Sequence, residues 1–363
     1  MKPLTPMEAV AALYADGHDG TAETIVASLG RAVFGDSGIT PAGPAQRLMA
    51  RASHRLMQWT TTRRQAGEEA TFRNALLERS GHPYARSLLA SSGQETESLV
   101  EGGDPMNGPY MMIAPEIRQA GTRWDRLFFN SVQGRDVQLR FIWETRATYD
   151  AARQALGQGR PVRLKALAAG TGLSMILAYD KLMREGCDAG LITVNITDRD
   201  PANTAKTKRL LGKLASTQGT ATEAESEGGI SAQTEDIFEA GGGPGVATYD
   251  VVTAVGILEY LQGFACLTTE QRLDLPQVRE EATALHLAER LGKITTESAS
   301  LIVNTYRPHA STRILEVFGK RFDYRHRADL SALLATAHFR PSRLVGSGTI
   351  YDVEVHEKFS PGS

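Results

Sequence analysis

Cysteine is scarce in this sequence, which has only Cys187 and Cys266 among 363 residues. Two thiols cannot build the disulfide framework of a small secreted domain, and these two lack the arrangement of a zinc site. Long apolar runs are also missing, since none approaches the length of about 18 residues that a membrane-spanning helix needs. The first residues show no charged segment followed by an apolar one, so no leader is expected. We therefore predict a cytoplasmic protein without a membrane partner or a metal site.

An excess of charge of one sign is absent as well. The formal net charge is -2, with charged residues making up 23% of the chain, so no global basic field favours nucleic acid. Two local basic clusters, Lys206–Arg209 and Arg321–Arg327, are interpreted as solvated faces. The expected partner is a small molecule rather than a nucleic acid, and a homodimer stays open.

Two nucleotide-binding fingerprints are missing. The stretch "AAGTGLS", Ala168–Ser174, does not match G-x-G-x-x-G, and no P-loop lysine is present. The acid Asp198 also lies further from Gly170 than the spacing of about 20 residues that is usual for a nicotinamide site. The run "GGGPG" at Gly241–Gly245 precedes a strand pattern instead of following one, and we interpret it as a linker.

The pattern of apolar residues changes along the chain. Residues 1–125 show apolar residues at helical spacing, broken by Gly and Pro, and predict an all-helical N-terminal cap. Residues 126–160 predict a connecting helix over the expected ligand site, spanning about Asn130 to Leu156. Residues 161–363 alternate strands with helices and predict the ligand-binding domain.

The strand patterns predict a mostly parallel sheet covered by helices on both faces. The terminal stretch "SRLVGSGTIYDVEVHEKF" reads as a hairpin, which implies one antiparallel edge strand. A helix is expected at Asp329–Ala337, and the expected strands are Val162–Ala168, Gly190–Asp198, Gly229–Gln233, Tyr249–Val255 and Ala299–Thr305.

Ligands of an open α/β sheet bind beyond the carboxyl ends of the strands, so the residues just after each strand are the candidates. Gly170 and Gly172 follow the first strand and allow close backbone approach. Asp198 ends the second strand, where an acid can accept from both hydroxyls of a ribose. Glu235 and Asp236 follow the third, placed to meet an adenine amino group. Beside Val255, after the fourth strand, the backbone can pack against the ligand.

Together these motifs resemble the class I S-adenosylmethionine-dependent methyltransferases over roughly Val162–Phe359. The resemblance implies an α/β fold, with a seven-stranded, mostly parallel, doubly wound sheet and an antiparallel last strand. It also implies S-adenosyl-L-methionine as the cofactor. Its methionine part would contact Ala168, Gly170 and Gly172, its ribose Asp198, and its adenine Asp236 or Glu235. The stretch "YDVVTAVGILEYL" is similar to the family's fourth motif.

The sequence departs from the family at two positions. Ala166 stands where the family usually has an acid, and Ala168 stands where it usually has Gly. Asn130 and Arg135, in "FFNSVQGRD", are predicted to compensate by binding the amino-acid end of the cofactor, with Arg140 as another candidate cation. An equally supported interpretation is that these residues only anchor the helical cap.

The resemblance implies methyl transfer to a small-molecule acceptor by in-line displacement, for which alignment and desolvation matter most. After the fifth strand, His309 is a candidate base and Tyr306 a candidate cation–π contact for the sulfonium. The loss of an acid at Ala166 favours one alternative. In it the aminobutyrate side chain is transferred or cyclised, as in nicotianamine- or azetidine-2-carboxylate-forming enzymes, with the cofactor as substrate and methylthioadenosine released. A non-catalytic cofactor-binding scaffold is the third hypothesis.

Overall fold

The structure is a computed structural model, and it describes residues 3–15, 19–61, 107–218, 229–238, 248–261, 284–309 and 323–360. The linker predicted at Gly241–Gly245, Cys266 and much of the helical pattern before residue 107 lie outside these ranges. The chain forms two compact units. The first comprises Met1–Leu139, Pro308–Phe322 and Gly348–Ile350, and the second Arg140–Arg307, Asp323–Ser347 and Tyr351–Ser363.

Before residue 125, each secondary-structure element of the first unit that the structure describes is a helix, as the sequence predicts. Its helices begin at capping residues: Thr5 and Glu8 form a reciprocal capping box before α1, as do Thr122 and Asp125 before α8. The helices of this unit are α1 (Pro6–Tyr14), α2 (Asp19–Phe34), α3 (Pro44–Thr61), α6 (Gly108–Met111), α7 (Pro115–Ala120) and α8 (Arg123–Phe129).

The helix predicted over Asn130–Leu156 is α9, and it begins two residues later, at Val132–Leu156. Asn130 is the C-cap of α8, and the Ser131 hydroxyl accepts a hydrogen bond from the backbone N–H of Gly134. The chain therefore closes one helix and caps the next within two residues. The boundary between the two compact units falls inside α9, between Leu139 and Arg140, whereas the three-part division drawn from the sequence stays a prediction.

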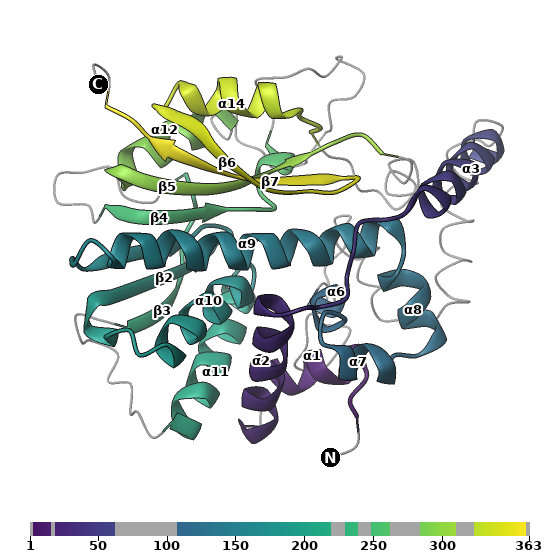
Figure 1. Cartoon of the computed structure of the whole chain (residues 1–363), viewed down its shortest axis with the longest axis horizontal. Helices are drawn as coiled ribbons and strands as arrows, with labels where there is room; N and C mark the ends of the chain where they lie inside the picture. Colours follow the sequence, from purple (N-terminus) through teal and green to yellow (C-terminus); the bar gives the residue numbers. More distant parts are fainter. Residues whose placement is uncertain are drawn as a thin grey trace. The chain divides into compact units, whose positions relative to one another are not determined.

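The second unit contains a seven-stranded mixed sheet in the order β3-β2-β1-β4-β5-β7-β6 (Figure 1). The strands β1 to β5 run parallel to one another, and β7 is antiparallel to both of its neighbours. This confirms the predicted sheet and its reversed last strand. The strands are β1 (Val162–Ala166), β2 (Ile192–Asp198), β3 (Gly229–Thr234), β4 (Tyr249–Ala254), β5 (Thr295–Tyr306), β6 (Phe339–Ser347) and β7 (Tyr351–Lys358).

Two strand predictions need correction. The antiparallel strand is not at the edge, because β7 is inserted between β5 and β6, which makes β6 the edge strand. Both β5 and β6 also begin earlier than their sequence patterns indicate. The first residues of β5 are polar, and two of them, Glu297 and Ser298, are exposed. The strand β6 carries Pro341, which only an edge strand or a bulge accommodates. Neither stretch therefore shows the alternation by which strands are recognised.

Helices cover both faces of the sheet. Leu301 and Val303 of β5 pack in one apolar core with α12 (Ala284–Ile294) and α14 (Arg327–Ala335). Ser300 of β5 points to the opposite face and lines a surface hollow together with Ala151 of α9. The part of α9 from Arg140 onward, which belongs to the second unit, runs in the direction of the neighbouring strands in Figure 1. The crossover helices are α10 (Leu173–Arg184) after β1 and α11 (Pro201–Gln218) after β2. The 3-10 turn η2 (Ala189–Leu191) lies just before β2, and the 3-10 turn η3 (Leu258–Tyr260) follows β4.

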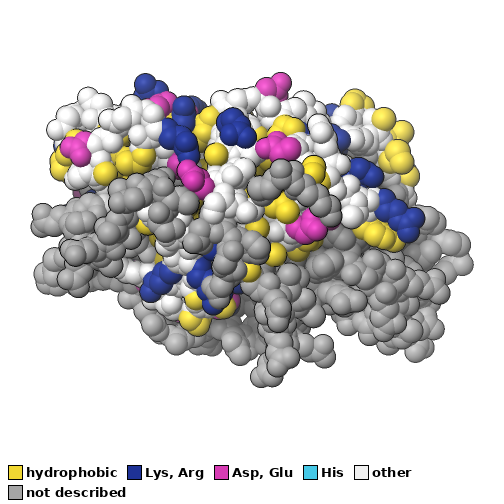
Figure 2. Space-filling model, turned by 90° about the horizontal axis from the view of Figure 1, so that it is seen from below, with side chains coloured by type: hydrophobic (Ala, Val, Ile, Leu, Met, Phe, Trp, Pro, Cys, Tyr) yellow, Lys and Arg dark blue, Asp and Glu magenta, His cyan; other side chains and the backbone are white. Residues whose placement is uncertain are grey.

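The surface of the described residues carries both signs of charge. On the face shown in Figure 2, Lys and Arg side chains are interspersed with Asp and Glu and do not form a field of one sign. Within the described part of the chain, no helix combines the length and the apolarity that crossing a bilayer requires.

Candidate functional site

The turn after β1 has an unusual backbone. Ala168, Gly170 and Gly172 all have positive φ angles, of 47°, 57° and 62°. The two glycines face different surroundings, because a Cβ on Gly172 would overlap the Ile196 side chain, whereas a Cβ on Gly170 would meet no atom of the described residues within 4 Å. Gly172 therefore lets the turn approach β2, and Gly170 leaves open space at the carboxyl end of β1.

Asp198 is held at the end of β2 by the loops around it. Its Oδ2 atom accepts a hydrogen bond of 2.7 Å from the backbone N–H of Gly170, and its Oδ1 atom accepts one of 2.8 Å from the N–H of Asp200. The Asn203 side chain donates to the same Oδ1 atom over 3.4 Å. The carboxylate is buried, and each carboxylate oxygen has about two acceptor sites. The glycine turn and the acid thus lie together, as the strand pattern predicts.

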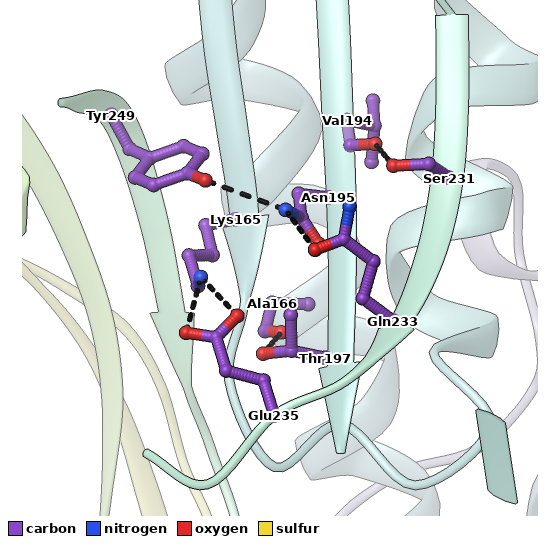
Figure 3. Close-up of polar contacts among 9 residues, drawn as sticks. All are labelled: Lys165, Ala166, Val194, Asn195, Thr197, Ser231, Gln233, Glu235 and Tyr249. Atoms are coloured by element: carbon purple, nitrogen blue, oxygen red, sulfur yellow. Dashed lines mark hydrogen bonds and ion pairs between the residues drawn. The ribbon is translucent and has the colours of Figure 1, made fainter. Parts of the chain in front are cut away.

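Glu235 follows β3 and is paired with a lysine that the sequence reasoning did not single out. Both of its carboxylate oxygens accept hydrogen bonds from Lys165 Nζ, at 2.8 and 2.7 Å (Figure 3). Lys165 lies in the middle of β1, is 4% exposed, and sits 5.1 Å from the centre of the Tyr249 ring. The Glu235 backbone N–H also donates to the carbonyl of Asp198. Both oxygens of the Glu235 carboxylate are therefore already bonded to Lys165.

The sequence contains a signal for this pair that was overlooked. A lysine inside the apolar run "VRLKALA" cannot be buried without an acid nearby, because an unpaired buried charge costs several kcal/mol. What sequence cannot supply is the identity of that acid, because the pairing spans β2: β1 and β3 each pair with β2 and not with each other.

The two remaining cofactor candidates lie on the loops after β3 and β4. Asp236 Oδ1 accepts a hydrogen bond of 2.9 Å from the N–H of Phe238, which stabilises the turn that carries it. Val255 is partly exposed at the end of β4. Gly256, next to it, has φ of 80° and donates its N–H to the buried Asn304 side chain of β5 over 2.7 Å. The end of β4 is thus held by β5.

Glu259 and Arg140 form a buried pair beyond the end of β4. Arg140 Nη1 lies 3.4 Å from Glu259 Oε1, with side-chain exposures of 13% and 3%. The guanidinium also lies 4.7 Å from the centre of the Tyr351 ring and within contact distance of a Cβ built on Gly256. Burial raises the pKa of Glu259, and the charge of Arg140 opposes that rise. The charge of Arg140 is thus paired with that of Glu259.

Glu144 lies on α9, one helical turn beyond Arg140. Glu144 Oε1 accepts a hydrogen bond of 2.7 Å from the Ser174 hydroxyl, in the first turn of α10. Burial raises the pKa of Glu144 to about 7, although the Ser174 bond and the charge of Arg140 both lower it. In the sequence, Glu144 is only one position on an incomplete apolar stripe of this helix, so the sequence analysis did not single it out.

The two candidate catalytic residues belong to different compact units. Tyr306 ends β5 in the second unit and is 3% exposed, with its ring 5.3 Å from that of Tyr324 and 4.9 Å from that of Tyr351. His309 belongs to the first unit and is partly exposed. Their predicted roles toward the sulfonium stay predictions.

Asn130 and Arg135 also belong to the first unit. Arg135 Nε donates to the backbone carbonyl of Asn130 over 3.3 Å, and both residues are partly exposed. Burial, together with the charge of Arg135, lowers the pKa of Arg118, whose guanidinium donates to the carbonyl of Ser37. These contacts describe the segment within its own unit, and its predicted part in cofactor binding stays a prediction.

Comparisons with known proteins are distant. No family model matches the sequence, and no curated protein matches it either. Among solved structures, a possible exported protein from Bordetella parapertussis has 14% identity and a TM-score of 0.44, over 83% of this chain and 99% of that one. The CurJ carbon methyltransferase has 15% identity and a TM-score of 0.44, over 80% and 71%.

A third solved structure is magnesium protoporphyrin IX methyltransferase from Synechocystis PCC 6803 with bound S-adenosylhomocysteine. It has 13% identity and a TM-score of 0.40, over 61% of this chain and 86% of that one. Structural similarities with TM-scores this low carry no argument about the fold. The order and direction of the strands identify it: five parallel strands are followed by a hairpin, and its last strand, β7, is inserted antiparallel between β5 and β6. The chain has the class I methyltransferase fold. In this fold the ends of β1 and β4 lie side by side where the strand order reverses, which is where ligands bind.

Proposed function

We propose that this chain is an S-adenosylmethionine-dependent transferase that methylates a small-molecule acceptor. The observation that carries the proposal is the pairing of an open glycine turn with a held carboxylate. Gly170 faces open space, and its N–H fixes Asp198 at the neighbouring strand end. Such a carboxylate suits the two hydroxyls of a ribose, and the open turn suits a ligand that lies against the backbone.

The remaining cofactor roles follow the resemblance. The backbone of Ala168, Gly170 and Gly172 would hold the methionine part, Asp236 or Glu235 the adenine, and Val255 would pack beside it. Because Lys165 already occupies both oxygens of Glu235, Asp236 is the better candidate for the adenine amino group. The cofactor would supply a methyl group on a positively charged sulfur.

The protein's part in such a reaction is to align the acceptor and exclude water. The acceptor atom bonds to the methyl carbon, and the electron pair of the broken bond stays on sulfur, leaving S-adenosylhomocysteine. His309 is proposed as the base for acceptors whose nucleophile carries a proton, and Tyr306 as a contact near the sulfonium. A cytoplasmic location, where this cofactor and small acceptors meet, completes the proposal.

Ala166 supports a second candidate function. It is buried at the end of β1, where the family usually has an acid, and its only side-chain atom is a methyl carbon. Without that acid the amino-acid end of the cofactor could take another orientation, which would suit transfer or cyclisation of the aminobutyrate group. Methylthioadenosine would then be the product.

Product analysis separates these functions. The chain is incubated with S-adenosylmethionine labelled in the methyl group, with and without small-molecule cell extract, and the products are identified by mass. S-adenosylhomocysteine with a labelled acceptor supports methyl transfer, and labelled methylthioadenosine supports the second function. Binding without consumption would favour a scaffold, and absence of binding would overturn the proposal.

Asp198 provides the test of cofactor binding. Asp198→Asn should weaken S-adenosylhomocysteine binding tenfold or more, because hydrogen bonds to a charged group contribute about 1.5–3 kcal/mol. Calorimetric titration measures the loss. Asp188→Asn is the matched control, since Asp188 accepts from Gly190 N–H at the opposite end of β2. Equal affinities for wild type and Asp198→Asn would remove Asp198 from the site.

Asn130 and Arg135 remain part of the proposal on sequence grounds. If they bind the amino-acid end, Asn130→Ala should weaken S-adenosylhomocysteine far more than adenosine, which lacks that end. Equal losses for both ligands, or none, would assign the segment to the structure of its own unit.

A further inference from the structure

Glu144 stands out among the acids of the second unit because its charge is poorly compensated. Within the part of the chain the structure describes, its carboxylate accepts one hydrogen bond, from Ser174. Arg140, the cation on α9 whose charge acts on Glu144, is already paired with Glu259. A partly buried carboxylate with one neutral donor favours the approach of a further cation.

The position of Glu144 indicates which cation that would be. Ser174 is two residues beyond Gly172, so the carboxylate lies at the start of α10, beside the glycine turn. The usual acid of that turn is missing, because Ala166 occupies its position at the end of β1. Glu144 therefore places a carboxylate from a different element near the strand end that lacks one.

We propose that Glu144 binds the ammonium group at the amino-acid end of the cofactor, in place of the acid missing at Ala166. This inference rests on the proposed function, since it assigns a residue to the same ligand. Ser174 acts as a positioning residue, because its hydroxyl holds Oε1 and leaves Oε2 for the ligand.

The inference predicts that the affinity for the cofactor's amino-acid end depends on pH. The direction of this dependence follows from the pKa of Glu144. Only the ionised carboxylate attracts an ammonium group. Burial raises the pKa of Glu144 to about 7, while Ser174 from α10 and Arg140 from α9 lower it, and Glu259 reaches it only through Arg140. Below pH 7 ligand binding must release a proton, so affinity should fall by up to tenfold for each unit of pH. Above about pH 8 it should be level.

The test compares two ligands by calorimetry between pH 6 and pH 8. S-adenosylhomocysteine carries the ammonium group, and methylthioadenosine does not. For the wild type, affinity for the first should rise with pH and affinity for the second should stay level. Glu144→Gln keeps an oxygen for the Ser174 bond but removes the charge. It should weaken S-adenosylhomocysteine tenfold or more at pH 8, abolish its pH dependence and leave methylthioadenosine within about twofold.

A second variant tests the positioning role. Ser174→Ala removes a bond that lowers the pKa of Glu144, so the pH midpoint for S-adenosylhomocysteine should move upward. Equal losses of both ligands in Glu144→Gln, or level wild-type affinity for S-adenosylhomocysteine from pH 6 to 8, would overturn the inference and leave the proposed function standing. If the wild type binds neither ligand at any pH, the proposed function fails first and the inference with it.

Discussion

Gly170 and Gly172 share a left-handed backbone conformation but differ in their surroundings. We therefore expect a substitution at Gly170 to affect ligand binding and one at Gly172 to affect stability. A methyl group at position 172 would overlap Ile196, whereas one at position 170 would enter open space. Gly172→Ala should lower the free energy of unfolding by about 2–4 kcal/mol, because strain and overpacking add. Gly170→Ala should lower it by only about 1–2 kcal/mol but weaken S-adenosylhomocysteine binding at least tenfold.

Urea unfolding and calorimetric titration of both variants check this pair of outcomes. Each glycine is the control for the other, since both have φ near 60° and lie in one turn. An equal loss of stability in the two variants would contradict the packing argument. Undiminished binding in Gly170→Ala would remove the open side of the turn from the cofactor site.

Ala168 adopts a conformation that L-residues rarely take, with φ of 47°. The left-handed region costs a residue with a Cβ about 1–2 kcal/mol, while replacing Ala by Gly costs about 0.4–1 kcal/mol through the unfolded chain. Ala168→Gly should therefore stabilise the protein by about 0.5–1 kcal/mol. Ala169→Gly, one residue along and without a positive φ, should instead destabilise it by about 0.4–1 kcal/mol. Urea unfolding compares the two, and a loss of stability in Ala168→Gly would mean that the turn is not strained.

Among the elements, β1 and the loop after β3 are joined by the Lys165–Glu235 pair (Figure 3). Lys165→Met should cost about 3 kcal/mol of unfolding free energy, because it leaves Glu235 partly buried without its cation. The double variant Lys165→Met, Glu235→Gln should recover to within about 1 kcal/mol of the wild type, since no unpaired charge remains. Arg343→Gln, which breaks an exposed pair with Asp150, should cost less than about 0.5 kcal/mol.

Chemical unfolding of the wild type, Lys165→Met, Glu235→Gln and the double variant gives the coupling energy between Lys165 and Glu235. A double variant that is as unstable as Lys165→Met would show that the pair contributes more than charge compensation. The same variants bear on the proposed function, because Lys165→Met removes the partner that occupies both carboxylate oxygens of Glu235.

For the whole molecule, the proposed cofactor should act on stability by mass action. A ligand that binds only the folded state adds about 2.7 kcal/mol at one hundred times its Kd. S-adenosylhomocysteine at that concentration should raise the Tm by a few degrees in differential scanning calorimetry. NAD at the same concentration should leave the Tm unchanged, because the turn after β1 lacks the dinucleotide fingerprint. A shift with NAD and none with S-adenosylhomocysteine would contradict the proposed cofactor.

The elements of the sheet could be predicted where their residues alternate or form a buried run. β1, β2 and β4 are such strands, and the sequence places each within two residues of its observed end. The starts of β5 and β6 could not be predicted in this way. Polar residues open β5, and Pro341 lies in β6, so both strands exist there because a neighbouring strand supplies the hydrogen bonds.

The sequence by itself determined the alternation of strands and helices after Val162, the glycine turn and the acid at Asp198. These features depend on neighbours along the chain, such as side-chain periodicity and the backbone freedom of glycine. Only the tertiary structure decided that Lys165 takes Glu235, that Glu144 meets Ser174, and that β7 enters the sheet between β5 and β6. The physical reason is that a charge responds to every group packed around it, and those groups come from elements that folding alone brings together.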